Sequence, residues 1–416
     1  MTTEADAVAS SVLREFERLP AKRKPQQRGD GTQEWVPISG IVARLGDGSL
    51  KCLTLATGMK CLPTTKLPLS RGNILHDWHA EVLCIRAFNH FLMQECKSIL
   101  ADAVDSPYIR LSTAADLTTS GRPPAPFVWR DDVTLHMYCS KAPCGDASME
   151  LTIAAQEDPA PWEEPLSKQM MEKNGLSTGS SESTPDLLPL GRAYFSLLGV
   201  VRRKPARADA LPTLSKSCSD KLAAKQCTSL LSSVTSLLVS PENVYLTTLV
   251  LPDSQYSVKA IERCFSPQGR MARAQRRWDG GYVFRPFEVQ TTGMEFDFSQ
   301  RRGRREGTKY VASNLAALWT ANGLVENIIG GVLQGRRQTD PKGGSAVSRR
   351  NMWALARYVA QQVAHIDEVI PGQGTYKDLK DAEVLAERRQ VKQDIREDAL
   401  KGWVRNIGDE DFEMSL

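Results

Sequence analysis

The sequence predicts an α/β fold in which one mixed sheet carries flanking helices and continues into a helical C-terminal part. Two apolar runs at residues 35–43 and 50–56 are separated by a glycine-containing turn, which is typical of a β-hairpin. Residues 82–92 place apolar side chains at helical spacing. Two long helical patterns, at residues 349–366 and 379–403, end the chain. These observations favour a single sheet that helices complete at its C-terminal end.

The first 30 residues are expected to form a helix and a polar stretch, ahead of one domain over residues 31–416. The helix is amphipathic, because its apolar residues recur at helical spacing. These residues are Ala7, Val8, Val12, Leu13, Phe16 and Leu19. Residues 22–31 are polar and lead to the first strand of the predicted hairpin.

The middle of the chain alternates between strand and helix patterns. Predicted strands cover residues 133–139, 244–251, 284–289 and 309–319, and predicted helices cover residues 222–239 and 257–265. Residues 156–190 are acidic and rich in proline and serine, so they have too little apolar surface to form a core. We expect this stretch to be a disordered surface insertion.

Composition and charge limit the classes of protein to which the chain can belong. The chain has 416 residues, of which 41% are apolar and 25% charged, as in globular proteins with one large domain or two ordinary ones. The formal net charge is +4, but residues 262–309 hold eleven Lys and Arg against six acids. A local excess of positive charge is typical of a polyanion-binding surface, and solvated faces show it as well.

Cysteine usage and hydropathy indicate the compartment. The nine cysteines have no framework spacing, the first residues lack an apolar leader, and no run approaches the roughly 20 apolar residues of a membrane span. We therefore expect a reduced intracellular protein, in the cytoplasm, the nucleus or both, with no membrane association. The sequence gives no sign of an obligate protein partner.

The helical pattern at residues 82–92 follows a short polar run that contains Asp77, His79 and Glu81. Asp77 is a suitable N-cap, so His79 and Glu81 are expected in the first helical turn, where a metal ligand and a carboxylate enter one site together. A His-x-Glu motif with a later Pro-Cys is the signature of zinc-dependent nucleobase deaminases, in which the Glu moves protons without binding the metal. Alone, the motif also fits an ordinary helix start with an acidic residue in its capping region.

Two cysteines are the remaining candidates for metal binding. The predicted strand at residues 133–139 leads into a Pro-Cys-Gly turn, and a helix that starts there would favour the thiolate of Cys144. A structural cysteine in a turn is the alternative. Ala147 replaces the second cysteine of a Pro-Cys-x-x-Cys motif, so the third ligand has to come from elsewhere, and Cys218 is the candidate. One His and two Cys leave a fourth position for water, as in catalytic zinc sites.

Three motifs in this order, His-Ala-Glu, Pro-Cys-Gly-Asp and Ser-Cys-Ser-Asp-Lys, resemble the deaminase domain of the ADAR family and its tRNA-specific adenosine deaminase relatives. The similarity covers most of the chain from about residue 35 onward. The resemblance implies a cytidine-deaminase-like mixed sheet, a helical C-terminal extension that encloses a polyphosphate site, and hydrolytic deamination of an RNA adenosine to inosine. It makes His79, Cys144 and Cys218 the zinc ligands and Glu81 the proton shuttle.

The branch of the family is indicated by two features. The sequence has no appended double-stranded-RNA-binding module, and its basic loop at residues 202–207 resembles the tRNA enzymes more than the editors of long duplexes. That branch modifies the adenosine 3′ of the anticodon of eukaryotic alanine tRNA. Expected contacts with RNA phosphates are Arg202, Arg203, Lys204 and Arg207, with the group at residues 270–277 as a further candidate.

The family also buries an inositol hexakisphosphate beneath its active site. Residues that match its binding positions are Lys60, Arg86, Lys221, Tyr376, Lys380, Trp403 and Asp411, and Asp77 would link the polyphosphate to zinc through Lys221. A buried polyanion is what many clustered Lys and Arg require. Positions that depart from the family pattern are Ile85 and Ala224, where Arg is frequent, Ala386, where Tyr is common, and Arg405 with Asn406, where the editors have Glu and Lys.

Two other functions stay open from the sequence. One is deamination of structured messenger RNA by the same chemistry. The other is a catalytically silent RNA-binding relative with a structural zinc, against which the presence of Glu81 argues, because a silent site has no need of a proton shuttle.

Overall fold

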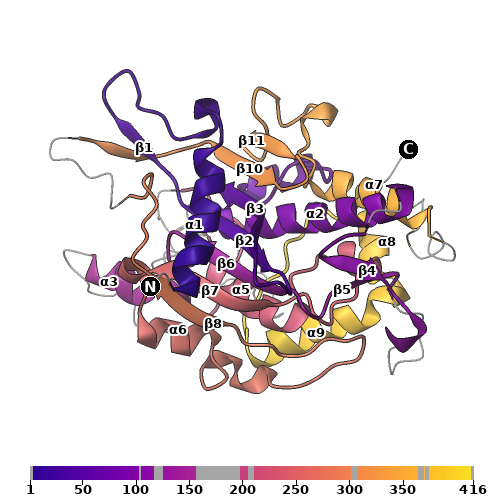
Figure 1. The fold of residues 1–416 in the computed structure, drawn as a ribbon. Helices are drawn as coiled ribbons and strands as arrows, with labels where there is room; N and C mark the ends of the chain where they lie inside the picture. The colour runs from indigo at the N-terminus through magenta and orange to yellow at the C-terminus, as the bar shows by residue number, and fades with distance from the viewer. Residues whose placement is uncertain are drawn as a thin grey trace, which may run out of the picture.

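The structure is a computed structural model, and it describes residues 3–102, 105–116, 125–155, 197–204, 210–300, 308–363, 370 and 374–413 (Figure 1). Its centre is an eight-stranded sheet in the order β12-β11-β10-β3-β2-β6-β7-β8. Strands β12 to β6 in this order pair antiparallel, whereas β6, β7 and β8 are parallel. The predicted mixed sheet is therefore confirmed.

Strands β2, β3, β6, β7 and β10 lie close to predicted runs, β8 begins four residues later than the predicted strand at residues 284–289, and β4, β5, β11 and β12 were not predicted. Their bounds are β2 Ile38–Arg44, β3 Leu50–Thr57, β6 Thr134–Cys139, β7 Leu246–Pro252, β8 Glu288–Thr292, β10 Ala316–Thr320, β11 Val325–Ile329 and β12 Val332–Leu333. Strands β2 and β3 form the predicted hairpin. The run at residues 309–319 is two strands, because β9 (Tyr310–Ala312) pairs with β1 (Gln33–Trp35) and only β10 joins the sheet. Strands β4 (Ile109–Leu111) and β5 (Phe127–Trp129) form a separate pair.

Helices cover both faces of the sheet. Helix α1 (Glu4–Glu17) is capped by Thr3 and packs through Val8, Val12 and Phe16 onto one face, which confirms the predicted amphipathic helix. Helix α2 (Ala80–Asp102) packs on the other face in the larger core. Neighbouring strand residues alternate between these cores, as the period of two in a β-strand requires: Ile41 faces the α2 side and Val42 faces the α1 side.

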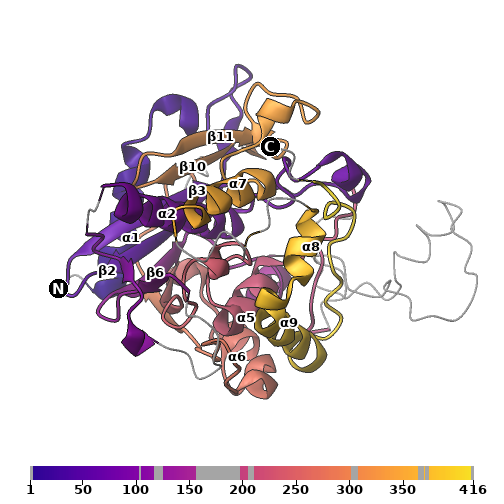
Figure 2. The same cartoon turned by 90° about the vertical axis from the view of Figure 1, so that its right-hand side faces the viewer.

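The remaining helices gather at one end of the molecule. They are α3 (Met149–Ala154), α5 (Cys218–Thr228), α6 (Val258–Phe265), α7 (Arg349–Ala360), α8 (Tyr376–Asp381) and α9 (Ala386–Asp398). Figure 2 shows α9 beside α5 and α7 beside α2, so the C-terminal part closes over the end of the sheet where α2 and α5 begin.

Three predicted helices are too long. The pattern at residues 349–366 ends at Ala360, where α7 is capped by Gln361, and residues 364–366 lie outside the described residues. The pattern at residues 222–239 ends at Thr228, because Ser229 adopts a left-handed backbone with φ of 56° that breaks the helix. The pattern at residues 379–403 is divided at Ala382, whose extended backbone separates α8 from α9. Arg389 donates hydrogen bonds to the carbonyl of Lys380 at 3.1 Å and to that of Ala382 at 2.5 Å, which satisfies acceptors exposed by the break. The predicted insertion at residues 156–190 lies outside the described residues.

No helix in the described ranges is both long and apolar enough to cross a membrane.

His90, which lies in α2, makes the folding stability of the protein dependent on pH. Its side chain is buried, and burial lowers its pKa to about 4, whereas an unfolded histidine has a pKa near 6.5. Between these values the unfolded chain binds more protons, so acidification destabilises the fold. Between pH 7 and pH 4.5 we expect the wild type to lose about 2 kcal/mol of folding stability through His90, and His90→Gln should not show this loss. Urea unfolding at both pH values measures this, and an unchanged pH dependence would contradict it.

Candidate active site

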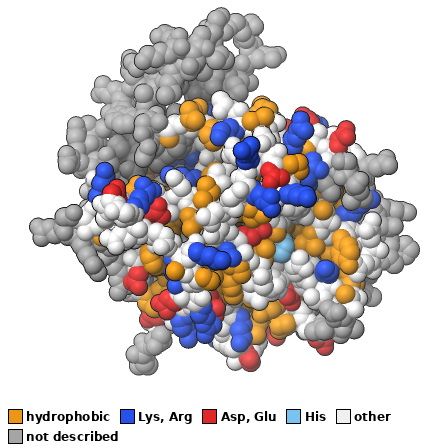
Figure 3. Space-filling model, turned by 90° about the horizontal axis from the view of Figure 1, so that it is seen from above, with side chains coloured by type: hydrophobic (Ala, Val, Ile, Leu, Met, Phe, Trp, Pro, Cys, Tyr) orange, Lys and Arg blue, Asp and Glu red, His pale blue; other side chains and the backbone are white. Residues whose placement is uncertain are grey.

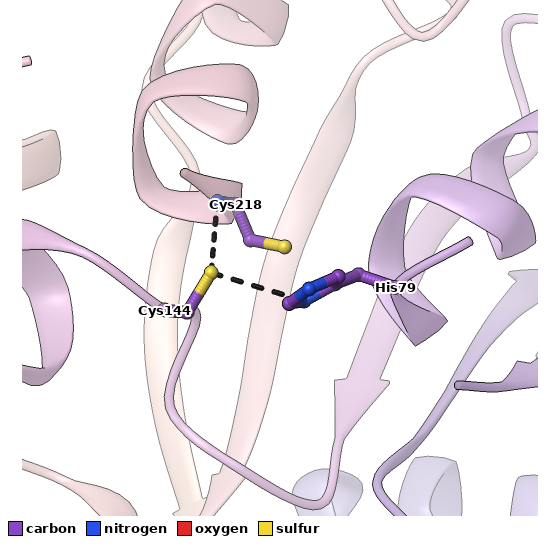
Figure 4. Close-up of side chains that lie close together, drawn as sticks. All are labelled: His79, Cys144 and Cys218. Atoms are coloured by element: carbon purple, nitrogen blue, oxygen red, sulfur yellow. Dashed lines mark hydrogen bonds between the residues drawn. The ribbon is translucent and has the colours of Figure 1, made fainter. Parts of the chain in front are cut away.

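Three elements bring one nitrogen and two sulfur ligands together (Figure 4). His79 directly precedes α2, Cys144 lies in the turn after β6, and Cys218 is the first residue of α5. Their ligand atoms all lie within 4.8 Å of one another. The Cys144 Sγ is 3.9 Å from His79 Nδ1 and accepts a hydrogen bond from the Cys218 backbone N–H at 3.3 Å. The structure thus brings close together the three residues that the sequence analysis selected as metal ligands.

Local backbone geometry fixes these ligands. The Asp77 carboxylate accepts a hydrogen bond from the His79 N–H at 3.0 Å, as expected of a residue at a helix start. Ser217 caps α5 by accepting from the Asp220 N–H, which places Cys218 in the first turn. Gly145 has a φ of 104°, and a Cβ there would lie 2.3 Å from the Ser217 hydroxyl oxygen. Only glycine therefore lets the Cys144 turn approach α5 this closely.

The donor set fits a catalytic zinc ion. Imidazole nitrogen and thiolate sulfur are preferred zinc ligands, and three protein ligands leave one position for a reacting molecule. The hydrogen bond with the Cys218 thiol, together with the charges of Lys204 and His79, holds the pKa of Cys144 well below its usual range despite burial. A metal-binding thiolate is favoured there before any metal arrives.

Glu81 lies in the first turn of α2 and is only 7% exposed. Burial raises the pKa of its carboxyl group, and the neighbouring Cys144 raises it further. A carboxyl group with a raised pKa can both accept and return a proton near neutral pH. Its position two residues beyond His79 agrees with the predicted entry of ligand and carboxylate into one site.

A second group of potential ligands contains Cys61, which the sequence analysis did not select. Its sulfur lies within 4.8 Å of ligand atoms of Asp77 and His79. However, Asp77 already forms ion pairs with Lys204, at 2.8 Å, and with Lys221. A cation in this group would compete with two lysines, so the His79, Cys144 and Cys218 set is the better metal site.

Lys204 is part of the zinc-site framework. Its side chain is 4% exposed and donates hydrogen bonds to Asp77 and, at 3.2 Å, to the Cys218 sulfur. Burial opposes the charge of this lysine, but Asp77 and the Cys218 thiol outweigh burial and raise its pKa well above the usual value. Lys204 therefore neutralises the charge that the ligands carry.

Arg202 and Lys204, which the sequence predicts to contact RNA, are buried residues, at 0% and 3% exposed, so their contact with RNA stays a prediction that this burial does not support. Arg270, from the second predicted group, is also buried and pairs with Asp220 at 2.6 Å. Arg203 is half-buried. Arg207 lies outside the described residues, so its role stays a prediction.

Two arginines hold the cysteine-bearing turns in place. Arg270 binds Asp220, which follows Cys218 by two residues, and Arg263 binds Asp146, which follows Cys144 by two residues, with its Nε 3.1 Å from both carboxylate oxygens. Both aspartates are fully buried. Each carboxylate therefore depends on its arginine for a counter-charge.

We expect Arg263→Gln to cost about 1–3 kcal/mol of folding stability, because the Asp146 carboxylate stays buried after its charged donor is removed. Arg276→Gln is a matched control, since each arginine binds two carboxylates, Asp146 and Glu150 for Arg263 and Asp394 and Asp398 for Arg276, but the Arg276 side chain is 40% exposed, where such pairs contribute under about 1 kcal/mol. Urea unfolding compares the variants, and equal losses would show that the Asp146 pair has no special role.

A buried cation cluster lies behind the zinc ligands. Burial, with Lys221 and Arg203 nearby, lowers the pKa of Lys216 to about 7, and burial with Arg349 lowers that of Lys380 to about 8. The cluster comprises the buried or half-buried cations Arg86, Lys216, Lys221, Lys225, Arg349, Lys380, Arg388, Lys392 and Arg396. Burial lowers the pKa of Arg86, Lys225, Lys392 and Arg396, and the charges of neighbouring cations lower it further. So many enclosed cations fit a strongly anionic ligand.

Several predicted polyphosphate residues border this cluster. Tyr376 lies under Arg349 and Lys380, and Trp403 lies under Lys216. Asp411 is exposed, and its charge interacts with Lys377, which is not a member of the cluster. Lys60 is half-buried on the loop whose carbonyl accepts from the Trp78 N–H. Ile85 packs in the apolar core, which explains the absence of Arg there.

The sequence analysis missed six members of the cluster: Lys216, Lys225, Arg349, Arg388, Lys392 and Arg396. Those on α9 recur at positions 388, 392 and 396, so a single face of the predicted helix carries them. That four-residue spacing was the available signal.

Comparison with known proteins agrees with the site. Residues 54–407 match the model of the adenosine-deaminase (editase) domain. The chain is 33% identical over 410 residues to the tRNA-specific adenosine deaminase 1 of Schizosaccharomyces pombe, which covers 97% of this chain and 95% of that protein. It is 32% identical over 259 residues to the Saccharomyces cerevisiae protein of that name, which covers 61% and 60% of the two chains.

A double-stranded RNA-specific editase B2 of Mus musculus is 27% identical over 149 residues, which cover 34% of this chain and 18% of that protein. The similarity to the tRNA-specific proteins thus extends much further along the chain. The family match begins within β3 and includes every later strand of the sheet, the metal-ligand set and the C-terminal helices. The chain belongs to the adenosine-deaminase (editase) domain family and is an enzyme that deaminates adenosine.

Proposed function

We propose that this enzyme hydrolytically deaminates adenosine to inosine in tRNA, at the position 3′ of the anticodon of alanine tRNA, with zinc held by His79, Cys144 and Cys218. The observation that carries the proposal is the buried Glu81 beside a three-ligand metal site. The name of the Schizosaccharomyces pombe relative, which matches nearly the whole chain, supports tRNA as the substrate.

The chemistry follows from the placement of the side chains. Zinc, when bound, supplies Lewis acidity that lowers the pKa of a water molecule toward about 7. Water adds its oxygen to C6 of the adenine ring, and Glu81 takes one water proton at its carboxylate and passes it to N1. Glu81 then carries the remaining hydroxyl proton to the amino group, the bond from C6 to the amino nitrogen breaks, and ammonia leaves a C6 carbonyl with a proton on N1. The raised pKa of the Glu81 carboxyl suits both transfers.

Access to the buried ligands favours an unpaired base. An adenine stacked in a duplex has to flip before its C6 reaches the metal ligands, whereas an anticodon loop already presents splayed bases. Structured messenger RNA is the second candidate substrate, since the editase relative in the comparison is named for double-stranded RNA. A silent RNA-binding role would leave the placement of Glu81 without a purpose.

The buried cation cluster supports inositol hexakisphosphate as a resident cofactor. Its members come from α2, α5, α7, α8 and α9 and, in Lys216, from the stretch before α5, and the nearby acids Asp77, Asp220 and Asp409 are already paired. Lys221 belongs to the cluster and also binds Asp77, so it connects the polyphosphate region to the zinc ligands.

The test compares three RNAs under single-turnover conditions: alanine tRNA, the same tRNA with guanosine in place of the target adenosine, and a long RNA duplex. We expect inosine only in the first. Faster deamination of the duplex would overturn the tRNA assignment in favour of structured messenger RNA. Native mass spectrometry of the purified protein should show the added mass of inositol hexakisphosphate and of zinc.

A further inference from the structure

Two surface segments carry most of the exposed positive charge beside the loop that leads to the zinc ligands. The first is the loop at residues 64–72, and the second connects β12 to α7. Together they expose five cations, Lys66, Arg71, Arg336, Arg337 and Lys342, and with the half-buried Arg350 at the start of α7 these form what we call the basic surface. Figure 3, which views the molecule from above, shows Lys and Arg side chains on the face that it presents, in small groups among acidic and apolar side chains.

The two segments form one continuous surface. Lys66 Nζ donates to Gln338 Oε1 at 3.0 Å, and Arg350 Nε donates to the Arg71 carbonyl at 3.2 Å. Beneath them, the Leu75 N–H donates to the Gly331 carbonyl at 2.8 Å. These hydrogen bonds join the two segments, so the backbone positions that carry the cations are held relative to one another.

Acidic groups leave this surface largely unneutralised. Asp340 pairs with Arg336 at 3.3 Å and is the acid within the second segment. The nearby acids at the C-terminal end interact with other residues. Asp409 is buried and pairs with His76 and Arg349. The negative charge of Glu410 interacts with Lys380, and that of Asp411 interacts with Lys377. A dense positive surface with little compensation attracts a polyanion.

The basic surface is joined to the segments that carry two of the zinc ligands. Its loop continues through His76 into the ligand His79, and the Leu62 N–H donates to the His76 carbonyl at 2.9 Å. Thr64, which begins the loop, donates through its N–H and its hydroxyl to the Pro212 carbonyl, at 3.0 and 3.1 Å. Pro212 belongs to the segment that runs on to Cys218. The same short stretch of chain therefore connects the exposed cations with both His79 and Cys218.

We propose that the basic surface binds the phosphate backbone of the tRNA outside the reacting nucleotide, and so replaces Arg202, Lys204 and Arg270 as the site of electrostatic recognition. This inference rests on the proposed function. The contact is made to phosphates, so it supplies affinity and orientation without reading sequence.

The test uses the variant Arg336→Gln/Arg337→Gln/Lys342→Gln, whose three side chains are exposed. Its matched control is Arg14→Gln/Arg18→Gln/Lys259→Gln, which removes the same charge from exposed positions in α1, just after α1 and in α6. Affinity for alanine tRNA is measured by filter binding from low to high salt, and deamination is measured with saturating tRNA.

We expect the first variant to bind tRNA about tenfold more weakly, with a salt dependence shallower by about 2, since each lost phosphate contact reduces the slope by roughly 0.7–0.9. The control should match the wild type, and saturating tRNA should restore the rate of the first variant. If the variant and the control had equal affinities and salt slopes, the proposed role of the basic surface in tRNA binding would be wrong. Inosine formation by the wild type would still support the proposed function in that case. If the wild type neither binds nor deaminates tRNA, the proposed function and this inference both fail.

Discussion

Glu81→Gln is expected to lower the rate of inosine formation by about 10⁴-fold while leaving zinc in place. The amide keeps the size and hydrogen-bonding capacity of the carboxyl group but cannot carry a proton from water to the leaving amine. Glu81 is absent from the ligand set of His79, Cys144 and Cys218, so metal binding does not depend on it. The measurement is single-turnover deamination, with zinc quantified in the same preparation.

The matching variant is Cys218→Ser, which should lose both zinc and activity because the metal keeps only two of its three protein ligands. The pair separates a proton-transfer role from a metal-binding role. If Glu81→Gln lost zinc together with activity, Glu81 would act as a ligand or a structural support, and the proposed division of labour would be wrong.

Lys204→Met should destabilise the fold by about 3–5 kcal/mol, since it leaves the Asp77 carboxylate and the cysteine ligands without their closest buried cation. A cost of this size reflects one partner left behind in a buried ion pair. Urea unfolding measures it, with Lys51→Met as the control for an exposed lysine. Zinc retention should fall in parallel, because two thiolates repel each other more strongly without the lysine.

The opposite result has a clear meaning for Lys204. If Lys204→Met unfolded like the wild type and instead lost affinity for tRNA, the residue would contact RNA as the sequence suggested. Charge reversal at Lys204 would not test RNA binding, because a glutamate at position 204 would face Asp77 in a buried site.

The candidate site was predictable from sequence because its chemistry lies in short motifs on regular elements. His79 and Glu81 are two residues apart at a helix start, and Cys144 and Cys218 each occupy the turn that follows a strand or opens a helix. Residue type and local structure together determine what these positions can do. The hairpin of β2 and β3 and the amphipathic α1 were predictable for the same reason.

Burial and long-range pairing were not predictable in this way. Lys204 and Asp77 are 127 positions apart, and Arg263 and Asp146 are 117 apart, so no local pattern distinguishes these cations from surface charges. A basic run such as residues 202–204 suits RNA and a buried ion pair equally well in sequence. The break between α8 and α9 depends on Arg389, whose side chain bonds carbonyls exposed at Ala382.

The central claim is tested most directly by sequencing alanine tRNA after incubation with the purified enzyme, with zinc measured per chain and Cys218→Ser treated in parallel. Inosine pairs like guanosine, so conversion is read as a change from A to G. The account predicts complete conversion at the nucleotide 3′ of the anticodon by wild type that holds one zinc, and none by the variant without zinc. Unmodified tRNA after incubation with fully zinc-loaded wild type, or conversion by zinc-free Cys218→Ser, would contradict it.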